Sequence, residues 1–236
     1  MNRQPRSVLI TGSSRGIGNQ LAQRMLARGD TVYGCARTAP SITHDNYTHF
    51  VADVADDVAV REMFRHISAV GTGLQLVVNN AGLSHTGLAI LTGSQEAEKV
   101  ILANLLGAFL ISREAIKLMK RAGFGRIVHF SSINVPLAST GSALYNASKA
   151  GVGNLALTLS RECAADDITI NCLGLSIVVG SGMAASLSSR AVTAKQEMLP
   201  KPKPIEIDEI LHAIDFLAAP EARNITGQTI YYGGIA

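Results

Sequence analysis

The chain has 236 residues and a nearly balanced charge, with 21 lysines and arginines against 18 aspartates and glutamates and a formal net charge of +3. Hydrophobic residues make up 47% and charged residues 17%, and the mean hydropathy is +0.22. These values exclude a disordered chain and disfavour a protein that binds nucleic acid through charge. No linker-like composition or internal repeat divides the sequence, so we predict that residues 1–236 form one domain.

The cysteines and the N-terminus indicate the compartment. Cys35, Cys163 and Cys172 show no C-x-x-C pairing and are typical of buried, reduced thiols. The first six residues lead into a strand-like segment without the apolar stretch of a signal peptide. The uncharged stretch 168–189 contains Asn171 and several glycines and serines, which disfavours a membrane helix. We therefore expect a cytoplasmic protein with neither a membrane nor a nucleic-acid partner.

Short apolar runs alternate with longer segments of helical periodicity along the whole chain. The runs predict seven strands, at 7–11, 31–36, 48–51, 74–78, 126–130, 168–172 and 228–232. Helical spacing predicts helices over 17–26, 60–67, 105–120, 144–164 and 208–217, the second of them capped by Asp56 or Asp57. This alternation predicts an α/β fold with a single, doubly wound parallel sheet and helices on both faces.

A glycine-rich turn, Thr11-Gly12-Ser13-Ser14-Arg15-Gly16-Ile17-Gly18, joins the first strand to the first helix. Glycine is suited to a positive φ and to a close approach of the backbone to a pyrophosphate, which the N-terminus of the following helix can hold. Such glycines can also serve only to pack a strand against a helix. The position after the first strand of an α/β chain favours the dinucleotide site.

Further motifs follow in order along the chain: Asn79-Asn80-Ala81-Gly82 after the fourth strand, Asn104, Ser132, and Tyr145-x-x-x-Lys149 thirteen residues beyond that serine. With the glycine turn, they resemble the motifs of the short-chain dehydrogenases/reductases, collinearly from Val8 to Gly234. The resemblance implies a Rossmann-type fold, an NAD(P)-dependent oxidoreductase, and a homodimer or homotetramer. The apolar faces of the helices over 105–120 and 144–164 are expected to pair between subunits, unless they only cover their own sheet.

The end of the second strand predicts NADP(H) as the cofactor. An acidic residue there would repel a 2′-phosphate, but the chain has Ala36 followed by Arg37, whose guanidinium can bind a phosphate through two hydrogen bonds. Arg15 can approach the same phosphate from the glycine turn. The alternative is that both arginines are merely solvated. The cofactor contacts expected from the resemblance are Gly12, Ser14, Arg15, Gly16, Ile17, Gly18, Arg37, Asp53, Val54, Asn80, Ala81, Gly82, Tyr145, Lys149 and Val178.

Reduction of a ketone requires a proton donor beside the developing alkoxide. Tyr145 is the candidate, and Lys149 lies one helical turn away, where its charge would lower the pKa of the tyrosine by about three units, or about 4 kcal/mol. Ser132 can hydrogen-bond the substrate oxygen. By resemblance, Asn104 holds a water that relays protons through Lys149, and Lys149 also holds the nicotinamide ribose. No cluster of residues has metal-ligand spacing, so no catalytic metal is predicted.

The sequence departs from the family pattern after the sixth strand. Leu175 and Ser176 stand where the family usually has Pro-Gly, and the later cofactor-contacting threonine has no clean match, with Gly180 or Ser181 nearest. Residues 174–204 are therefore the expected substrate loop and the segment to which the resemblance transfers least. His85, after the Asn79–Gly82 motif, either lines the substrate pocket or is an ordinary polar loop residue.

The glycine turn with the Ala36-Arg37 pair looks most like that of 3-oxoacyl-acyl-carrier-protein reductases. The resemblance implies reduction of a carrier-bound 3-oxoacyl thioester, with the acidic carrier docking on a basic surface for which Lys117, Lys120, Arg121 and Arg126 are candidates. Asp166-Asp167 stands where such reductases often have a basic residue, which leaves open a specialised-pathway enzyme acting on a free carbonyl compound. A third alternative is a non-catalytic NADP(H) sensor.

Overall fold

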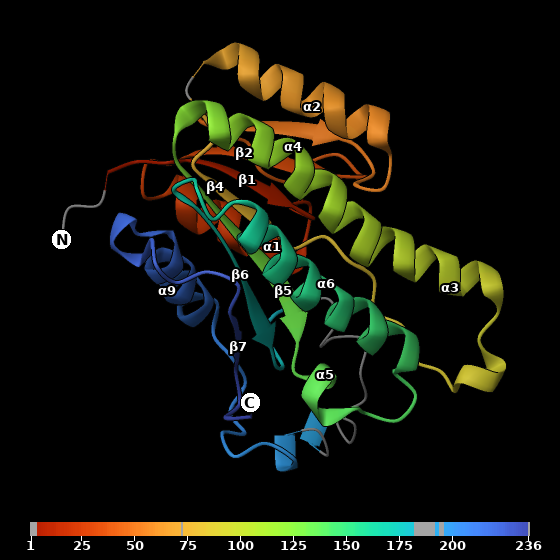
Figure 1. Ribbon diagram of the computed structural model, residues 1–236. Coiled ribbons are helices and arrows are strands. Elements are labelled where there is room, and N and C mark those ends of the chain that lie inside the picture. Colours follow the sequence, from red (N-terminus) through yellow and green to blue (C-terminus); the bar gives the residue numbers. More distant parts are fainter. Residues whose placement is uncertain (1–3, 72, 182–191, 194–195, 236) are drawn as a thin grey trace.

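The computed structural model describes residues 4–71, 73–181, 192–193 and 196–235, whose strands form one parallel sheet in the order β3-β2-β1-β4-β5-β6-β7 (Figure 1). The order reverses between β1 and β4, so the sheet is doubly wound, as predicted. The strands are β1 (Ser7–Thr11), β2 (Thr31–Ala36), β3 (Tyr47–Val51), β4 (Leu76–Asn79), β5 (Gly125–Ser132), β6 (Ile168–Leu175) and β7 (Thr229–Tyr231).

Helices cover both faces of the sheet, each with its own apolar core. On one face, Phe64 of α2 (Asp57–Val70), Ile111 of α4 (Gly107–Ala122) and Val152 of α6 (Ala143–Glu162) belong to one cluster. On the other face, Leu21 of α1 (Gly16–Leu26) and Ile210 of α9 (Ile207–Ala218) belong to a second. Figure 1 shows this division, with α2, α4 and α6 on the near side. The fully buried strands β1, β4, β5 and β6 explain the continuous apolar runs.

The helix ends follow from local sequence. Asp56 precedes α2 and accepts hydrogen bonds from the backbone nitrogens of Val58 and Ala59 at 2.9 and 3.1 Å, which confirms it as the cap. Gly71 ends this helix with φ of 78°. The predicted strand at 74–78 begins two residues too early, because Leu74 is buried but lies outside the ladder, whereas β6 extends three residues beyond its predicted end.

One long helical rod was only partly predicted. The helix α3 (Ser94–Ile101), a π-helical turn η2 (Leu102–Leu106) and α4 follow one another without a break, and Figure 1 shows α3 and α4 as a single rod. The helix α3 was missed because its polar sequence buries only Val100. The short elements η1 (Ala89–Leu91), α5 (Asn134–Leu137) and η3 (Pro220–Ala222) were also missed.

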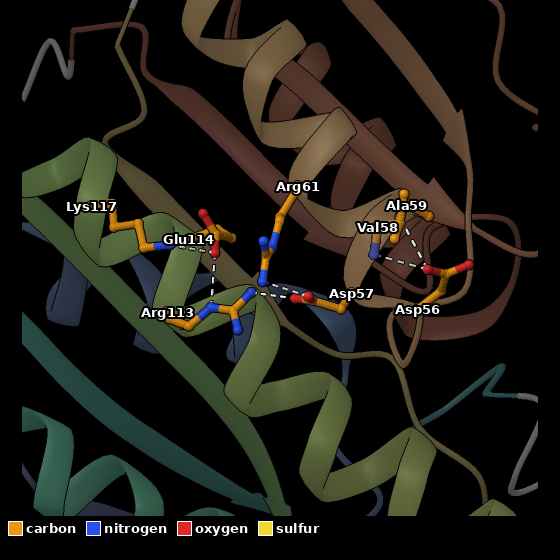
Figure 2. Close-up of polar contacts among 8 residues, drawn as sticks. All are labelled: Asp56, Asp57, Val58, Ala59, Arg61, Arg113, Glu114 and Lys117. Carbon is orange, nitrogen blue, oxygen red and sulfur yellow. Dashed lines mark hydrogen bonds and ion pairs between the residues drawn. The ribbon is translucent and has the colours of Figure 1, made fainter.

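Ion pairs fasten α2 to α4 at the surface (Figure 2). Arg113 of α4 pairs with Asp57 at the start of α2, and Arg61 reaches the same carboxylate at 2.6 Å. Arg113 also contacts Glu114 at 2.8 Å, and Lys117 contacts that glutamate at 2.7 Å. This network holds α4, and with it the π-helical turn at its start, against the adjacent helix.

Two further observations concern the described residues alone. None of their helices is both long enough and apolar enough to cross a bilayer. Cys35, Cys163 and Cys172 are all buried free thiols, and burial raises the pKa of Cys35 and of Cys172 to about 12, so both thiols stay protonated at neutral pH.

Candidate active site

The glycine turn between β1 and α1 has the shape that its sequence predicts. Gly12 and Gly16 adopt φ of 70° and 60°, where a side chain would be strained. A Cβ on Gly18 would lie 2.4 Å from the carbonyl oxygen of Gly12, so only glycine lets the start of α1 approach the turn this closely. The glycines therefore let the turn pack closely against the N-terminus of α1, which is the arrangement that receives a dinucleotide pyrophosphate.

The turn after β4 is bound directly to the glycine turn. The hydroxyl of Thr11 accepts hydrogen bonds from the backbone nitrogens of Asn80 and Ala81 at 3.0 and 2.9 Å and donates to Oδ1 of Asn79 at 3.2 Å. The side chain of Asn80 donates to the carbonyl oxygens of Thr11 and Gly12 at 2.8 and 3.3 Å. The two motifs thus form one hydrogen-bonded unit at the carboxyl edge of the sheet.

The remaining expected cofactor contacts lie along the same edge. Arg15 is the residue before α1 and Arg37 the residue after β2, and both are exposed. Among the described residues, no carboxylate forms an ion pair with either guanidinium. Asp53 and Val54 follow β3, where the carboxylate of Asp53 accepts a hydrogen bond from the backbone nitrogen of Ala55 at 2.9 Å. That bond makes Asp53 a turn former as well as an expected adenine contact.

Three of the expected catalytic residues come together from two elements. Ser132 ends β5, and its hydroxyl lies close enough to Tyr145 on α6 to lower the pKa of the tyrosine. Lys149 follows one helical turn later and donates from Nζ to the carbonyl oxygen of Phe130 on β5 at 2.8 Å. All three side chains are buried, with exposed fractions of 5–7%.

Protonation in this cluster differs from the expectation in one respect. Burial raises the pKa of Tyr145 above its ordinary 10.0, and its hydrogen bond to Ser132 offsets this only in part. Burial also lowers the pKa of Lys149 to about 8. The predicted lowering of the tyrosine pKa by lysine was therefore wrong for the chain alone, because desolvation dominates at both groups. At neutral pH the tyrosine is a neutral phenol, the form that can donate a proton.

Asn104 lies within the π-helical turn and is 1% exposed. Its amide exchanges two hydrogen bonds with the backbone of Leu83, at 2.7 and 3.0 Å, and donates a third to the hydroxyl of Ser148 at 2.9 Å. A Cβ on Gly82 would lie 2.9 Å from its Oδ1 and 3.4 Å from Nζ of Lys149. The asparagine and the lysine therefore flank the same glycine, although the asparagine amide is largely engaged by the protein itself.

A cavity of about 290 Å³ lies over Ser132 and Tyr145. The expected residues Ile17, Asn80, Gly82, Lys149 and Val178 also line it, whereas the remaining expected cofactor contacts are not among its lining residues. His85 stands in the cavity wall, where its Nε2 contacts the hydroxyl of Thr92 at 3.0 Å. Further polar wall residues were missed, because the segments that carry them have no motif of their own: Ser84, Thr86, Asn134, Ser139, Thr140 and Ser142.

The expected substrate loop is described in part. Leu175, which replaces the family's proline, ends β6, pairs in register with Ser132 and accepts a hydrogen bond from the backbone nitrogen of Ile133 at 2.9 Å. Ser176 and Ser181 line the cavity, and Gly180 accepts a hydrogen bond from Gln20 at 3.4 Å. Residues 182–191 and 194–195, including Gly182, lie outside the described residues.

The expected basic docking surface is largely neutralised. Arg126 is fully buried in β5 beneath the ring of Phe124 and pairs with Asp167 at 2.9 Å, so it cannot belong to a docking surface. Lys120 pairs with Asp166 at 2.8 Å, and Lys117 pairs with Glu114 (Figure 2). Of the four candidates, only Arg121 is exposed with no described ion-pair partner.

These features define a nicotinamide-dependent oxidoreductase with a tyrosine-lysine pair, and comparison with known proteins agrees. Residues 6–191 match the family model of the short chain dehydrogenases, so the chain belongs to that family. It is 34% identical over 232 residues to the 3-oxoacyl-[acyl-carrier-protein] reductase FabG of Rickettsia conorii, covering 96% of this chain and 94% of that protein. It is 31% identical over 245 residues to the enzyme of the same name from Escherichia coli, covering 99% and 98%.

Solved structures give the same classification. A putative gluconate dehydrogenase from Agrobacterium tumefaciens superposes with a TM-score of 0.88 at 28% identity, covering 97% of this chain and 94% of that one. The structure of ElxO with NADP bound superposes with a TM-score of 0.87 at 27% identity, covering 97% of both chains. The fold class and the enzyme class predicted from the sequence are thereby confirmed.

Proposed function

We propose that the protein reduces a ketone to a secondary alcohol with NADPH. The observation that carries this proposal is the buried side chain of Tyr145, which lines the cavity together with Ser132 and lies one helical turn from Lys149. A neutral phenol, a hydroxyl and an ammonium group converge there on a space large enough for a small carbonyl group and its substituents.

Each residue has a distinct part in the proposed reaction. When bound, NADPH supplies the hydride to the carbonyl carbon. Ser132 donates a hydrogen bond to the carbonyl oxygen, which orients the substrate and stabilises the charge that develops there. Tyr145 donates its proton to the same oxygen, and Lys149 in its cationic form stabilises the phenolate that remains. In the expected relay, a water beside Asn104 returns a proton through Lys149.

The preference for NADP(H) rests on the chain's own residues. Side chains at Gly12 and Gly18 would collide with Asn80 and with the carbonyl oxygen of Gly12, so glycine at both positions keeps the tight turn that a pyrophosphate needs at the start of α1. Ala36 leaves no carboxylate at the end of β2, and Arg15 and Arg37 flank the place of an adenosine 2′-phosphate with exposed guanidinium groups. The glycine turn, Asp53, Val54 and the turn after β4 would hold the remainder of the dinucleotide, with Val178 beside the nicotinamide.

The first candidate substrate is a 3-oxoacyl thioester on an acyl carrier protein. Full-length similarity to 3-oxoacyl-[acyl-carrier-protein] reductases supports it. An alternative, a free carbonyl metabolite of a specialised pathway, is favoured by two observations: the ion pairing of Lys117 and Lys120 and the polar side chains of the cavity wall. The non-catalytic sensor has the least support, because Asn104, Ser132, Tyr145 and Lys149 are all present and clustered.

The assay that separates these candidates follows NADPH oxidation with three substrates: acetoacetyl thioester, the same acyl group on an acyl carrier protein, and free hydroxy- and diketones. A carrier-protein reductase prefers the carrier-bound substrate, whereas the alternative enzyme prefers a free ketone. Tyr145→Phe is expected to lower kcat/KM at least a hundredfold with unchanged binding of NADPH, because general acid catalysis contributes about 10²–10⁴-fold. A Tyr145→Phe variant as active as the wild type would exclude the proposed acid.

We further propose that the protein is a cytoplasmic homodimer or homotetramer that pairs through α4 and α6. Most apolar side chains of these helices cover the sheet, but Phe109 and Leu157 remain 38% and 36% exposed on their outer faces. A closed symmetric assembly would bury them. Light scattering distinguishes a monomer from either assembly, and Phe109→Glu is expected to dissociate it.

A further inference from the structure

A chain of four hydrogen-bonded groups crosses the sheet beneath the adenosine end of the expected cofactor site. The hydroxyl of Ser13, in the glycine turn, lies 3.1 Å from the hydroxyl of Tyr47 on β3. That tyrosine hydroxyl lies 2.8 Å from Nδ1 of His49 on the same strand. Nε2 of His49 lies 3.0 Å from the carbonyl oxygen of Thr38, just after β2. The chain therefore connects the turns that follow β1 and β2.

The direction of each bond follows from the chemistry of the groups. A carbonyl oxygen can only accept, so Nε2 of His49 donates to Thr38. In the neutral imidazole, Nδ1 is then an acceptor and receives the proton of Tyr47, whose oxygen in turn accepts from Ser13. Every member is satisfied in a single arrangement, and Ser13, the inner end of the chain, is fully buried. Such a network has one geometry and holds its two ends at a fixed separation.

A glycine in the middle of β2, Gly34, leaves space for this hydrogen-bonded network. Tyr47 is in register with Val32, but its side chain reaches forward over β2 to Gly34. A Cβ on Gly34 would lie 2.0 Å from the tyrosine hydroxyl and 2.5 Å from the hydroxyl of Ser13. Glycine is otherwise unfavourable inside a buried strand, so its presence here is explained by the side chain that occupies its place.

Both ends of this hydrogen-bonded network lie close in sequence to the arginines assigned to the 2′-phosphate. Ser13 lies two residues before Arg15, and Thr38 directly follows Arg37. A second contact fastens the same connection to α1, because the amide of Asn19 donates to the carbonyl oxygen of Ser13 at 3.2 Å and to the hydroxyl of Ser41 at 2.9 Å. The short connection after β2, which contains no helix, is thus held by His49 at Thr38 and by Asn19 at Ser41.

We propose that Tyr47 and His49 are positioning residues that determine the selection of NADP(H) over NAD(H). They hold the turns of Arg15 and Arg37 at the separation that a 2′-phosphate bridges, so less conformational entropy is lost when the phosphate binds. This inference rests on the proposed preference for NADP(H). It predicts that loss of the network weakens only the dinucleotide that carries the phosphate.

Three variants test it: Tyr47→Phe and His49→Gln, which remove links of the chain, and Gly34→Ala, which displaces the tyrosine. Calorimetric titration of the full-length protein with NADP⁺ and with NAD⁺ measures binding without turnover. Each variant is expected to weaken NADP⁺ about fivefold or more, the equivalent of one hydrogen bond, and to change NAD⁺ less than twofold. kcat with saturating NADPH is expected to be unchanged.

Tyr232→Phe is the matched control. It also loses one tyrosine hydrogen bond, to the carbonyl oxygen of Glu209 at 3.1 Å, but it lies beyond β7 at the opposite edge of the sheet.

The outcomes separate the two proposals. If the wild type binds NADP⁺ and NAD⁺ equally, the proposed cofactor preference fails, and this inference with it. If the wild type prefers NADP⁺ but the variants keep that preference, or lose affinity for both dinucleotides alike, only the role of Tyr47 and His49 is overturned. Because His49 is partly exposed, His49→Gln provides the test even if the Gly34→Ala variant does not fold.

Discussion

The ammonium group of Lys149 is held by the carbonyl oxygen of Phe130, at 2.8 Å, two residues before Ser132 on the same strand. One strand therefore positions both the serine proposed to bind the substrate oxygen and the lysine proposed to support the proton donor. Because that lysine is buried and has a pKa near 8, its charge depends on pH within the range in which the enzyme can be assayed.

The first prediction concerns this charge. Below pH about 8, Lys149 is cationic and stabilises the phenolate of Tyr145, and above it the charge is lost. We expect kcat/KM for ketone reduction to be level between pH 6 and 7 and to fall about tenfold per unit of pH above about 8. The tyrosine itself does not cause this fall, because its pKa is raised above 10.0. A profile that stays level to pH 10 would contradict the assignment, and Lys99→Met, on the exposed side of α3, is expected to leave the profile unchanged.

The second prediction concerns Arg37. Arg37→Ala removes a charge-assisted contact worth about 1.5–3 kcal/mol, so we expect the KM for NADPH to rise about 10- to 100-fold and that for NADH to change less than twofold. Steady-state kinetics with both cofactors measure this. Arg65→Ala, on the exposed face of α2, is the control and is expected to behave like the wild type. Equal losses with both cofactors would mean that Arg37 does not meet the 2′-phosphate.

The third prediction compares two glycines within helices. Gly18→Ala places a methyl group 2.4 Å from the carbonyl oxygen of Gly12, so we expect a lower melting temperature and weaker binding of NADP⁺. Gly153→Ala in α6 meets only the hydroxyl of Thr229 at 3.6 Å, an ordinary contact, and is expected to stabilise the protein by about 0.5–1 kcal/mol. Thermal melts and titration of both variants test the pair. Similar effects at the two positions would show that the close approach of α1 to the glycine turn does not require glycine at position 18.

The fourth prediction concerns His129, which is fully buried in β5 beside Ser112. Burial and the charge of Lys149 lower its pKa from 6.5 to about 3. The unfolded chain therefore takes up a proton at this histidine before the folded protein does. Its contribution to stability is complete above pH 6.5 and is lost as the pH falls toward 3, with a slope approaching about 1.4 kcal/mol per unit.

We expect the free energy of unfolding, measured by urea denaturation, to fall less steeply between pH 6.5 and 4 in His129→Leu than in the wild type. The variant leaves Ser112 satisfied, because its hydroxyl still donates to the carbonyl oxygen of Ala108 at 2.8 Å. Carboxylates elsewhere contribute equally to both proteins and cancel in the comparison. Parallel slopes would show that His129 is protonated in the folded state.

Local patterns predicted the sheet, because a buried parallel strand must be apolar on both faces and a glycine turn after the first strand has few other uses. Features that depend on contacts between distant segments were not predictable. Lys120 pairs with Asp166, 46 residues away, and the buried Arg126 pairs with Asp167, 41 residues away, so from the sequence these cations looked like a free basic surface. The π-helical turn at Asn104 leaves no periodic signal, because it spans only Leu102–Leu106.

The protonation of Tyr145 was mispredicted for a related reason. The spacing of Tyr145 and Lys149 correctly indicates neighbours on one helical face, but it says nothing of the solvent around them. Both side chains are buried, and loss of water changes their pKa values more than their mutual charge does. Asn134 and the other polar wall residues of the cavity were likewise missed, because a cavity is formed by the fold and not by any single segment.

Leu175 stands where the family usually has a proline, and it separates the end of the sheet beside Ser132 from the start of the expected substrate loop. Since Leu175 lies in the ladder opposite Ser132 and its carbonyl oxygen accepts from Ile133, the sheet extends level with that serine, and the expected substrate loop leaves the sheet only at Ser176. The serine proposed to bind the substrate oxygen is therefore anchored apart from the segment proposed to meet the rest of the substrate. An engineer could exchange that segment with one from another family member and change what the enzyme accepts, while the reacting groups stay where they are.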